Sequence, residues 1–392
     1  MRTGSAAVGS ATPRLPSLQP EESARTPVLR MERLHLREQV RAFHAALPGV
    51  VPFYAVKCHP DPGVLAVLAS EGCSFDVASP QEVAAVRTLG TAPGTTYSNP
   101  ARSVHATAAA LAAGVRRFCF DSAGELRRLA LAAPGSDVSV RLAASPTKSV
   151  IRSEGKFGVT PELAVGLMLE ARALGLNPYG ISFHVGSQML DLQAWAEPVV
   201  RCGQIMRVLD RHGIRVETVN IGGGFPATYA APVPPLRAYG LAVRAALEGL
   251  PYAVDVVAEP GRCLVADAGT LHANVLGVVD RRSGTWLHTD VGVFNGMMEV
   301  LKTGGRLKYP ISDSRHAPAK RRYHLTGPTC DAQDAYAHDV LLSQGLTDGD
   351  QVFIESAGAY TTSYATDFNG FPRPDVLVVS GRQSRIWRLR PK

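Results

Sequence analysis

The sequence contains few cysteines, and none of them forms a CxxC pair. The six cysteines of this 392-residue chain lie far apart, at Cys58, Cys73, Cys119, Cys202, Cys263 and Cys330. Disulfide scaffolds and zinc sites use denser or more closely spaced sets, so this spacing favours reduced thiols in a cytoplasmic protein. We therefore expect a cytoplasmic location and no metal site.

Long apolar runs are also missing. No run reaches the roughly 18 residues that a membrane-spanning helix requires, so we expect no membrane partner. Residues 1–26 are rich in Ser, Ala, Thr and Pro and contain no compact apolar stretch. This composition predicts a disordered N-terminal tail rather than a signal peptide.

Dense basic patches and nucleotide-binding motifs are absent too. The formal net charge is +7, but Lys and Arg are scattered and the cluster Lys320–Arg322 is short, so we expect no nucleic-acid partner. The run Gly222–Gly224 lacks the GxGxxG spacing, and no GK[ST] follows it, which disfavours a nucleotide. The excess of positive charge is weak evidence for acidic small molecules or phosphate.

A regular alternation of short strands and helices begins at Met31. With 45% hydrophobic residues, the chain is long enough for two domains. The predicted strands are Val50–Lys57, Cys73–Ser79, Thr95–Pro100, Arg117–Ser122, Val138–Ala143, Ile181–Ser187, Thr218–Phe225 and Val254–Gly261. The predicted helices are Glu32–Leu47, Gly63–Glu71, Pro80–Leu89, Val104–Ala113, Ala123–Ala133, Pro161–Leu174, Leu192–His212 and Leu236–Leu250.

Eight such units in about 230 residues fit a closed (β/α)8 TIM-like barrel better than an open doubly wound sheet. After about Asp267 the pattern changes to short strands separated by Gly, Pro and Asp turns, which predicts a second, all-β domain. Its predicted strands are Trp286–Asp290, Arg322–Leu325, Gln351–Ser356 and Val376–Val379. We expect the barrel to span residues 27–267 and the β domain residues 268–392, with a possible contribution from residues 27–31.

The carboxyl ends of the predicted strands carry polar and glycine residues. In chain order these are Lys57, Asp76, Asn99, Asp121, Arg141, His184 with Ser187, Gly222–Gly224, and Glu259 with Arg262. Any one of them can be a loop residue that caps the next helix, and we favour that role for Asn99 and Asp121. Together they predict a functional site at one mouth of the barrel.

Lys57 closes an apolar run, VVPFYAVK, before a turn. A desolvated ammonium is costly unless it is neutral, paired or used covalently, so Lys57 is a candidate imine-forming amine. The alternative is a strand-end lysine that reaches into solvent. The other strand ends decide between these interpretations.

The remaining strand-end residues have complementary roles. Backbone N–H groups of Gly222–Gly224 can approach a phosphate closely, and Arg262 can add a charge-assisted contact. Ser187 can donate a hydroxyl group, and the flat imidazole of His184 can stack on an aromatic ring, although a neutral core histidine is the alternative. With Lys57 and the carboxylate of Glu259, this set predicts a site for pyridoxal 5'-phosphate (PLP).

An ordered series of motifs supports this interpretation: AVKCHPDP, FDVAS, KFGV, FHVGSQ, NIGGGFP, EPGR, GPTCDAQD, and GAYT with FNGF. From Thr26 to the C-terminus, the chain resembles the fold-type-III PLP-dependent decarboxylases, which have an alanine racemase-like barrel. It is most similar to the ornithine decarboxylase branch of short bacterial type. An alanine racemase usually has an arginine where Glu259 lies, so Glu259 favours decarboxylation over racemisation.

The resemblance implies roles for the site residues. Lys57 would be the Schiff-base lysine, His184 the ring that stacks on the cofactor, and Glu259 the partner of the pyridine nitrogen. The implied phosphate contacts are Ser187, Gly223, Gly224, Arg262 and Tyr360. Asp76 and Arg141 would line the cofactor near the imine and the ring hydroxyl.

The resemblance also implies a head-to-tail homodimer in which the GPTCDAQD turn of one subunit completes the site of the other. Cys330 would donate a proton, Asp331 would bind the distal ammonium of the substrate, and Lys156 and Asp334 would form an ion pair across the dimer. Phe368 and Glu299 are further substrate-binding candidates. We consider Glu299 because the chain has Thr303 near the position where eukaryotic ornithine enzymes place an acidic residue.

The expected reaction is the conversion of ornithine, a basic amino acid, to putrescine and CO2 in polyamine biosynthesis. Lysine or another diamino acid, including diaminopimelate, is an alternative substrate in a specialised pathway. A homologue that binds PLP or a regulatory partner without catalysis is an alternative of another class. Lys57, Cys330 and the β domain argue for the enzyme.

Overall fold

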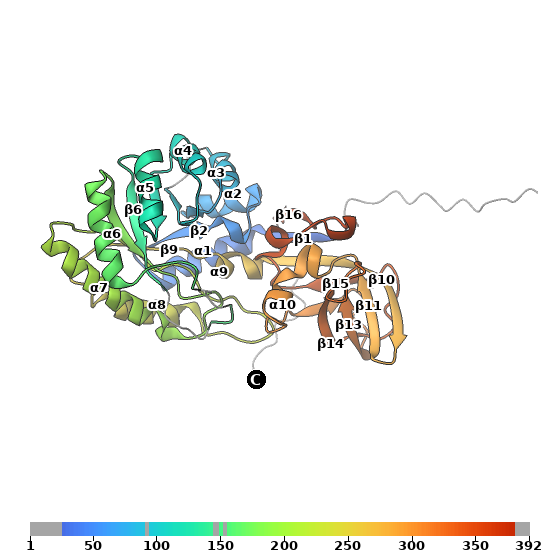
Figure 1. The fold of residues 1–392 in the computed structure, drawn as a ribbon. Coiled ribbons are helices and arrows are strands. Elements are labelled where there is room, and N and C mark those ends of the chain that lie inside the picture. Colours follow the sequence, from blue (N-terminus) through green and yellow to red (C-terminus); the bar gives the residue numbers. More distant parts are fainter. Residues whose placement is uncertain (1–25, 91–93, 144–148, 152–154, 381–392) are drawn as a thin grey trace, which may run out of the picture.

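The structure is a computed structural model that describes residues 26–90, 94–143, 149–151 and 155–380. The predicted tail lies outside the described residues except for Thr26. Two parts are seen in Figure 1, a barrel surrounded by helices and a β sheet formed mainly by the C-terminal third of the chain. None of the described helices is long and apolar enough to cross a membrane.

Eight parallel strands close into a barrel in the order in which they occur along the chain. They are β2 (Val50–Ala55), β3 (Ser74–Val77), β4 (Thr95–Tyr97), β5 (Arg117–Phe120), β6 (Asp137–Arg141), β7 (Asn177–Ser182), β8 (Thr218–Asn220) and β9 (Asp255–Ala258). The first strand pairs with the last, Val51 opposite Val257, so the predicted barrel is confirmed and the open sheet is excluded.

Every barrel strand ends before the residue at which the sequence pattern predicted its end. Lys57, predicted to close the first strand, instead lies in a single 3-10 turn, η2 (Val56–Cys58), after β2 ends at Ala55. His184 and Ser187 likewise follow β7, which ends at Ser182. Most of the predicted strand-end residues therefore lie in the loops at the mouth, outside the β ladder, whereas Asp76 and Arg141 lie within β3 and β6.

The predicted helices are confirmed, and they surround the barrel in Figure 1. They are α1 (Arg33–Ala46), α2 (Pro62–Ser70), α3 (Pro80–Arg87), α4 (Val104–Ala112), α5 (Ala123–Ala132), α6 (Pro161–Ala173), α7 (Ala196–Arg211) and α8 (Leu236–Leu247). A 3-10 turn, η3 (Leu192–Trp195), precedes α7 within the predicted helix Leu192–His212. Side chains of Ser79, Ser103, Ser122 and Thr160 accept hydrogen bonds from N–H groups in the first turns of α3 to α6.

The second sheet has eight strands, among them the predicted strands of the β domain. They are β1 (Val28–Glu32), β10 (Gly269–Arg281), β11 (Gly284–Thr289), β12 (Ile311–Asp313), β13 (Lys320–Thr326), β14 (Ala335–Ser343), β15 (Gln351–Ile354) and β16 (Asp375–Val379). Short helical segments are α9 (Arg262–Val265), η4 (Ala266–Ala268), η5 (Val293–Met297), α10 (Met298–Lys302), α11 (Thr361–Tyr364) and η6 (Phe368–Gly370). β1 pairs antiparallel with β10 and parallel with β16, so the start of the described chain joins the C-terminal sheet.

An aromatic cluster fixes the loop that follows β8. Trp195 stacks on Phe225 with ring centroids 4.9 Å apart, and Tyr239 contacts both rings edge-on. The Trp195 indole N–H donates to the carbonyl oxygen of Ile221 at 3.2 Å. The residues on both sides of Gly222–Gly224 are therefore held by buried aromatic packing.

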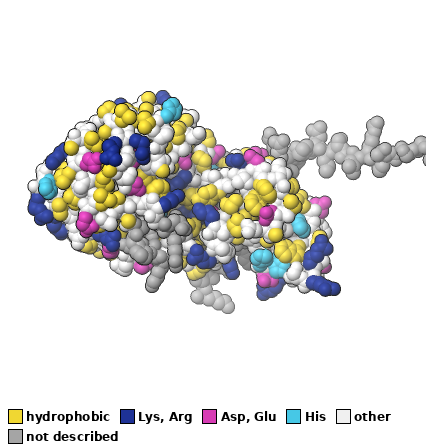
Figure 2. All heavy atoms as spheres, in the orientation of Figure 1, with side chains coloured by type: hydrophobic (Ala, Val, Ile, Leu, Met, Phe, Trp, Pro, Cys, Tyr) yellow, Lys and Arg dark blue, Asp and Glu magenta, His cyan; other side chains and the backbone are white. Residues whose placement is uncertain are grey.

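Charged side chains are spread over the visible face of the molecule. In Figure 2, Lys and Arg lie among acidic and hydrophobic side chains on both the barrel and the sheet, rather than in one continuous basic patch. This distribution agrees with the scattered Lys and Arg of the sequence.

Two glycines on barrel helices give opposite predictions for the same substitution. A Cβ on Gly240 of α8 would overlap the carbonyl oxygen of Ala46 in α1, whereas a Cβ on Gly166 of α6 would meet no atom within 4 Å. We expect Gly240→Ala to lower the free energy of unfolding by about 1–3 kcal/mol, because two helices must separate. Gly166→Ala should raise it by about 0.5–1 kcal/mol, because alanine favours the helix. Urea unfolding of both variants tests this packing, and equal effects would contradict it.

Candidate active site

A cavity of about 330 Å³ lies at the carboxyl end of the barrel strands. Of the residues predicted for the site, its lining includes Lys57, Asp76, Asn99, Arg141, His184, Ser187, Gly223, Gly224, Glu259, Arg262 and Tyr360. Residues from seven barrel strand ends and from the C-terminal part of the chain thus meet in one place, as the barrel prediction requires.

Lys57 lies at one end of the cavity beside a buried carboxylate. Its Nζ is 3.2 Å from Oδ2 of Asp76, and its side chain is 50% exposed whereas that of Asp76 is 2% exposed. Burial lowers the pKa of Lys57, but Asp76 and Glu259 outweigh it and raise that pKa above its usual value. Burial and Glu259 raise the pKa of Asp76 to about 7. Asp76 therefore pairs with the Lys57 ammonium, and this pairing favours the protonated form of the lysine.

One carboxylate oxygen of Glu259 is held by two donors, and the other is available. Oε1 accepts from the Ser98 hydroxyl at 2.6 Å and from the Asn220 amide at 2.7 Å. Two donors on one oxygen stabilise the ionised carboxylate. Among the described residues, Oε2 has no such donor, so it can accept a hydrogen bond from a group inside the cavity.

His184 presents a neutral ring to the cavity. Its Nδ1 accepts from the backbone N–H of Gly223 at 3.2 Å, so the proton of the neutral ring lies on Nε2. Burial, helped by the positive charge of Arg141, lowers the pKa of His184 to about 4. At neutral pH the imidazole is therefore an uncharged flat surface.

Gly223, Gly224 and Arg262 also belong to the wall of the cavity. Gly224 has a φ of 105°, and a Cβ there would overlap the carbonyl oxygen of Gly186, so only glycine fits this approach of two loops. Arg262 is 4% exposed, and among the described residues its Nε is buried without a hydrogen-bond partner. A buried N–H beside a glycine loop is matched by the acceptor oxygens of a phosphate.

Four predicted substrate-binding or catalytic residues, Glu299, Cys330, Asp331 and Phe368, do not line this cavity in their own chain. Cys330 and Asp331 are exposed, and Phe368 is 42% exposed. The Cys330 Sγ lies 3.5 Å from Oδ1 of Asn369, so the GPTCDAQD turn and the FNGF motif lie side by side. The structure thus brings the two motifs together on a surface outside the lining of this cavity.

Two acidic residues are placed differently from the sequence expectation. Glu299 lies beneath Arg262, with its side chain 3% exposed and both oxygens bound to that guanidinium, so it is not free to bind a substrate ammonium. Asp334 is fully buried, and its carboxylate accepts from Val293 N and from the N–H and hydroxyl of Thr329. In this structure its carboxylate is therefore unavailable for the expected intersubunit ion pair with Lys156.

Sequence reasoning missed Ser98, Asn220 and Tyr229. The first two hold Glu259, and their position at or next to a strand end was the available signal. Tyr229, which contacts Arg262, lies in a loop with no such signal. Asp121 accepts from the N–H of Gly158 at 2.9 Å, and Ser122 caps α5, so Asp121 does not cap the next helix as we expected.

Comparison with known proteins identifies the class. Residues 33–266 match the family model described as the pyridoxal binding domain of pyridoxal-dependent decarboxylases. The chain is 34% identical to the ornithine decarboxylase of Schizosaccharomyces pombe over 87% of this chain and 80% of that protein. It is 33% identical to the lysine/ornithine decarboxylase of Selenomonas ruminantium over 93% of this chain and 92% of that protein.

A solved structure has the same fold. The lysine/ornithine decarboxylase of Vibrio vulnificus, complexed with cadaverine, superposes with a TM-score of 0.84 at 33% identity, over 91% of this chain and 95% of that one. The chain therefore belongs to the fold-type-III pyridoxal-dependent decarboxylases, whose cofactor is PLP. Within that class it is a carboxy-lyase of the ornithine/lysine decarboxylase family, acting on a basic amino acid. The unpartnered Nε of Arg262, the glycine wall and the neutral ring of His184 fit this cofactor.

His184 gives a prediction for pH dependence. The pKa of its imidazole is about 4 in the fold and about 6.5 in the unfolded chain. Between these values the unfolded state binds a proton that the folded state does not, so stability present above pH 6.5 is lost as the pH falls towards 4. His184→Phe keeps a flat ring without this titration. We expect it to lose less stability than the wild type between pH 6.5 and 4, measured by urea unfolding, and an equal loss would contradict the buried neutral ring.

Proposed function

We propose that this enzyme decarboxylates L-ornithine to putrescine and CO2 in the cytoplasm, as a step in polyamine formation, with L-lysine as the second substrate. The proposal is based on the cavity whose lining contains Lys57, His184, Glu259 and Arg262. Relatives named for ornithine or for both amino acids support the choice of a diamine-forming reaction.

The cavity residues divide between the two ends of the cofactor. Lys57 would hold it covalently. Asp76, whose Oδ2 accepts a hydrogen bond from the Lys57 Nζ at 3.2 Å, would lie beside this point of attachment. His184 would support one face of the ring, Oε2 of Glu259 would accept from the ring nitrogen, and Arg141 would lie near the ring hydroxyl. Ser187, Gly223, Gly224, Arg262 and Tyr360 would hold the phosphate. When bound, PLP supplies an electron sink for the pair that the departing carboxylate leaves.

Glu259 is the residue that favours loss of CO2. A carboxylate next to the ring nitrogen keeps that nitrogen protonated and electron-withdrawing, whereas an arginine there would not. Its orientation depends on Ser98 and Asn220, which occupy Oε1. These two residues would position the carboxylate rather than contact the cofactor.

The substrate side of the site would come from a second chain. Asp331 accepts from the N–H of Gln333 through Oδ1 at 2.8 Å, which leaves Oδ2 for the distal ammonium of the substrate. Cys330, exposed beside it, would donate the proton that replaces the carboxylate, and Phe368 would cover the apolar stem of the substrate. We therefore propose a head-to-tail homodimer in which each surface of this kind enters the cavity of the other subunit.

A regulatory homologue without catalysis is the alternative from another class. It requires neither the Lys57–Asp76 pair nor the exposed thiol of Cys330, and both are present. A measurement of turnover separates the two functions directly.

The first test measures CO2 release from L-ornithine, L-lysine, L-arginine and diaminopimelate. We expect the highest kcat/KM for ornithine, a lower value for lysine, and at least a 10³-fold loss in Lys57→Ala, because covalent attachment starts from this amine. Borohydride treatment of the wild type should link the cofactor to Lys57 alone. Preference for arginine or diaminopimelate would overturn the substrate assignment, and cofactor binding without turnover of any of the four would favour the regulatory homologue.

The second test asks whether Asp331 acts in trans. Lys57→Ala and Asp331→Ala should each be inactive, and mixing them should restore about a quarter of wild-type activity, because half of the random dimers hold one intact site of two. Asp348→Ala, which removes another exposed carboxylate of the C-terminal part, should be fully active alone. No recovery on mixing, despite chain exchange shown by mass spectrometry, would place the complete site in one chain.

A further inference from the structure

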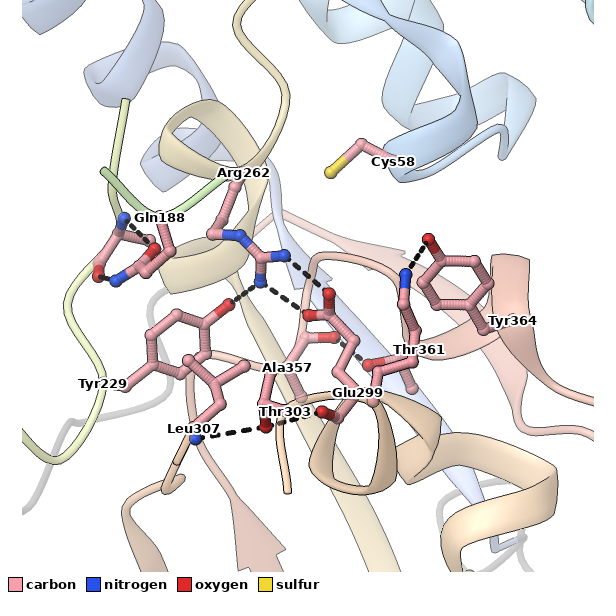
Figure 3. A network of polar contacts seen from close by, with 12 residues as sticks. Cys58, Gln188, Tyr229, Arg262, Glu299, Thr303, Leu307, Ala357, Thr361 and Tyr364 are labelled. Carbon is pink, nitrogen blue, oxygen red and sulfur yellow. Dashed lines mark hydrogen bonds and ion pairs between the residues drawn. The ribbon is translucent and has the colours of Figure 1, made fainter. Parts of the chain in front are cut away.

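A buried ion pair joins the barrel to the C-terminal part of the chain directly behind the cavity. Nη1 and Nη2 of Arg262 donate to the two oxygens of Glu299, each at 2.6 Å. The two side chains are 4% and 3% exposed. Figure 3 shows Arg262 extending from its helix towards Glu299 on a separate helix, with Tyr229 at the side. Arg262 begins α9, immediately after the barrel, and Glu299 belongs to α10.

The N–H groups of Arg262 can be assigned one by one. A guanidinium has five N–H donors in a rigid plane. Nη1 donates to Glu299 and to the Tyr229 hydroxyl, at 2.6 and 2.5 Å, and Nη2 donates once to Glu299. The donors that remain are Nε–H and the second N–H of Nη2. They are parallel and lie on the same edge of the guanidinium, in the geometry that binds two oxygens of a phosphate.

Arg262 belongs to the cavity wall. Arg262 lines the cavity together with Gly223, Gly224 and Tyr360, and the Tyr360 ring lies 4.9 Å from the guanidinium carbon. Among the described residues, Nε is the nitrogen of this side chain that is buried without a partner. A guanidinium turned about its Cδ–Nε axis or bound to Glu299 through Nε would lose this arrangement.

We propose that Glu299 is a positioning residue for the cofactor phosphate, because it holds the end of the Arg262 guanidinium and so presents the Nε and Nη2 edge to the phosphate. The inference rests on the proposed role of Arg262 as a phosphate contact. Glu299 acts through Arg262 and touches neither the phosphate nor the substrate.

A contribution to the stability of the fold does not by itself explain why Arg262 and Glu299 form a buried ion pair. Removing two charges from water is costly, and well-packed apolar residues often replace a buried ion pair without loss. The pair also carries no net charge, so Glu299 opposes any long-range attraction between Arg262 and an anion. What the carboxylate supplies is orientation, which matters for a ligand that needs two parallel N–H groups.

The experiment compares binding of PLP and of pyridoxal, which lacks the phosphate, to the full-length chain freed of cofactor by dialysis. No amino acid is present, so the result does not depend on the substrate assignment. In Glu299→Gln, the amide NH2 takes the place of one carboxylate oxygen and faces a guanidinium nitrogen. Both groups are hydrogen-bond donors, so the guanidinium must turn away from its present orientation. We expect PLP affinity to fall at least about tenfold and pyridoxal affinity to change less than twofold, measured by absorbance of the bound cofactor.

Glu125→Gln is the matched control. Glu125 pairs with Arg102 at 2.6 Å, with side chains 1% and 0% exposed, and neither residue lines the cavity. This change also disrupts a buried carboxylate–arginine pair, but it should leave the ratio of PLP to pyridoxal affinity unchanged. A similar fall of that ratio in both variants would mean that Glu299 has only a structural role.

A double-mutant cycle tests whether Glu299 acts through Arg262. In an Arg262→Ala background, Glu299→Gln should have no further effect on the ratio, because the group that it positions is gone. Tyr229→Phe removes only the hydrogen bond from Arg262 Nη1 to the Tyr229 hydroxyl, so it should lower the ratio of PLP to pyridoxal affinity by a smaller factor. This variant replaces Glu299→Gln in the test if Glu299→Gln does not fold. Unchanged or tighter PLP binding in Glu299→Gln, an equal loss for pyridoxal, or additive effects in the cycle would overturn the proposal.

Discussion

The arrangement of the active site depends on the seam at which the barrel closes. β2 and β9 are separated by about 200 residues of sequence, yet Val50, Val51 and Pro52 lie opposite Val256, Val257 and Ala258. The N–H of Ala55 continues this pairing by donating to the carbonyl oxygen of Pro260 at 3.0 Å. Because both strands run in the same direction, the loops that carry Lys57 and Glu259 leave the barrel side by side.

Closure also brings the charged groups of the cavity close together. The carboxylates of Asp76 and Glu259 share a low-dielectric space with Lys57, and each has donors from neighbouring strand ends. Ser98 serves both, since its N–H donates to Asp76 and its hydroxyl to Glu259. The charged form of Lys57 is therefore stabilised by groups of the barrel, before any cofactor contributes.

Much of the barrel and most of its mouth could be predicted from the sequence, because each follows from a local pattern. The alternation of strands and helices predicts the barrel. In a barrel the carboxyl ends of all strands lie at one mouth, so residues that follow them, such as Lys57, His184 and Glu259, are expected to meet there. The loop positions after β2 and β7 were not predicted, since apolar runs continue past the last ladder bond. The sequence distance between Arg262 and Glu299 likewise carries no sign that they pair, and nothing local distinguishes the buried Asp334 from the exposed Asp331.

The two ends of the cavity are built in different ways. The lysine end uses only barrel residues, whose relative positions are set by the strand ladders. The end proposed to hold the phosphate combines the barrel loop of Gly223 and Gly224 with Tyr360, whose N–H donates to the Cys58 carbonyl oxygen at 2.8 Å, and with Arg262, which is paired with Glu299. On this proposal, contacts between the barrel and the C-terminal part would determine how well the phosphate is held. Since β1 at the start of the described chain pairs with β10 and β16, the chain is fastened to that C-terminal part on both sides of the barrel, which limits rotation of one part against the other.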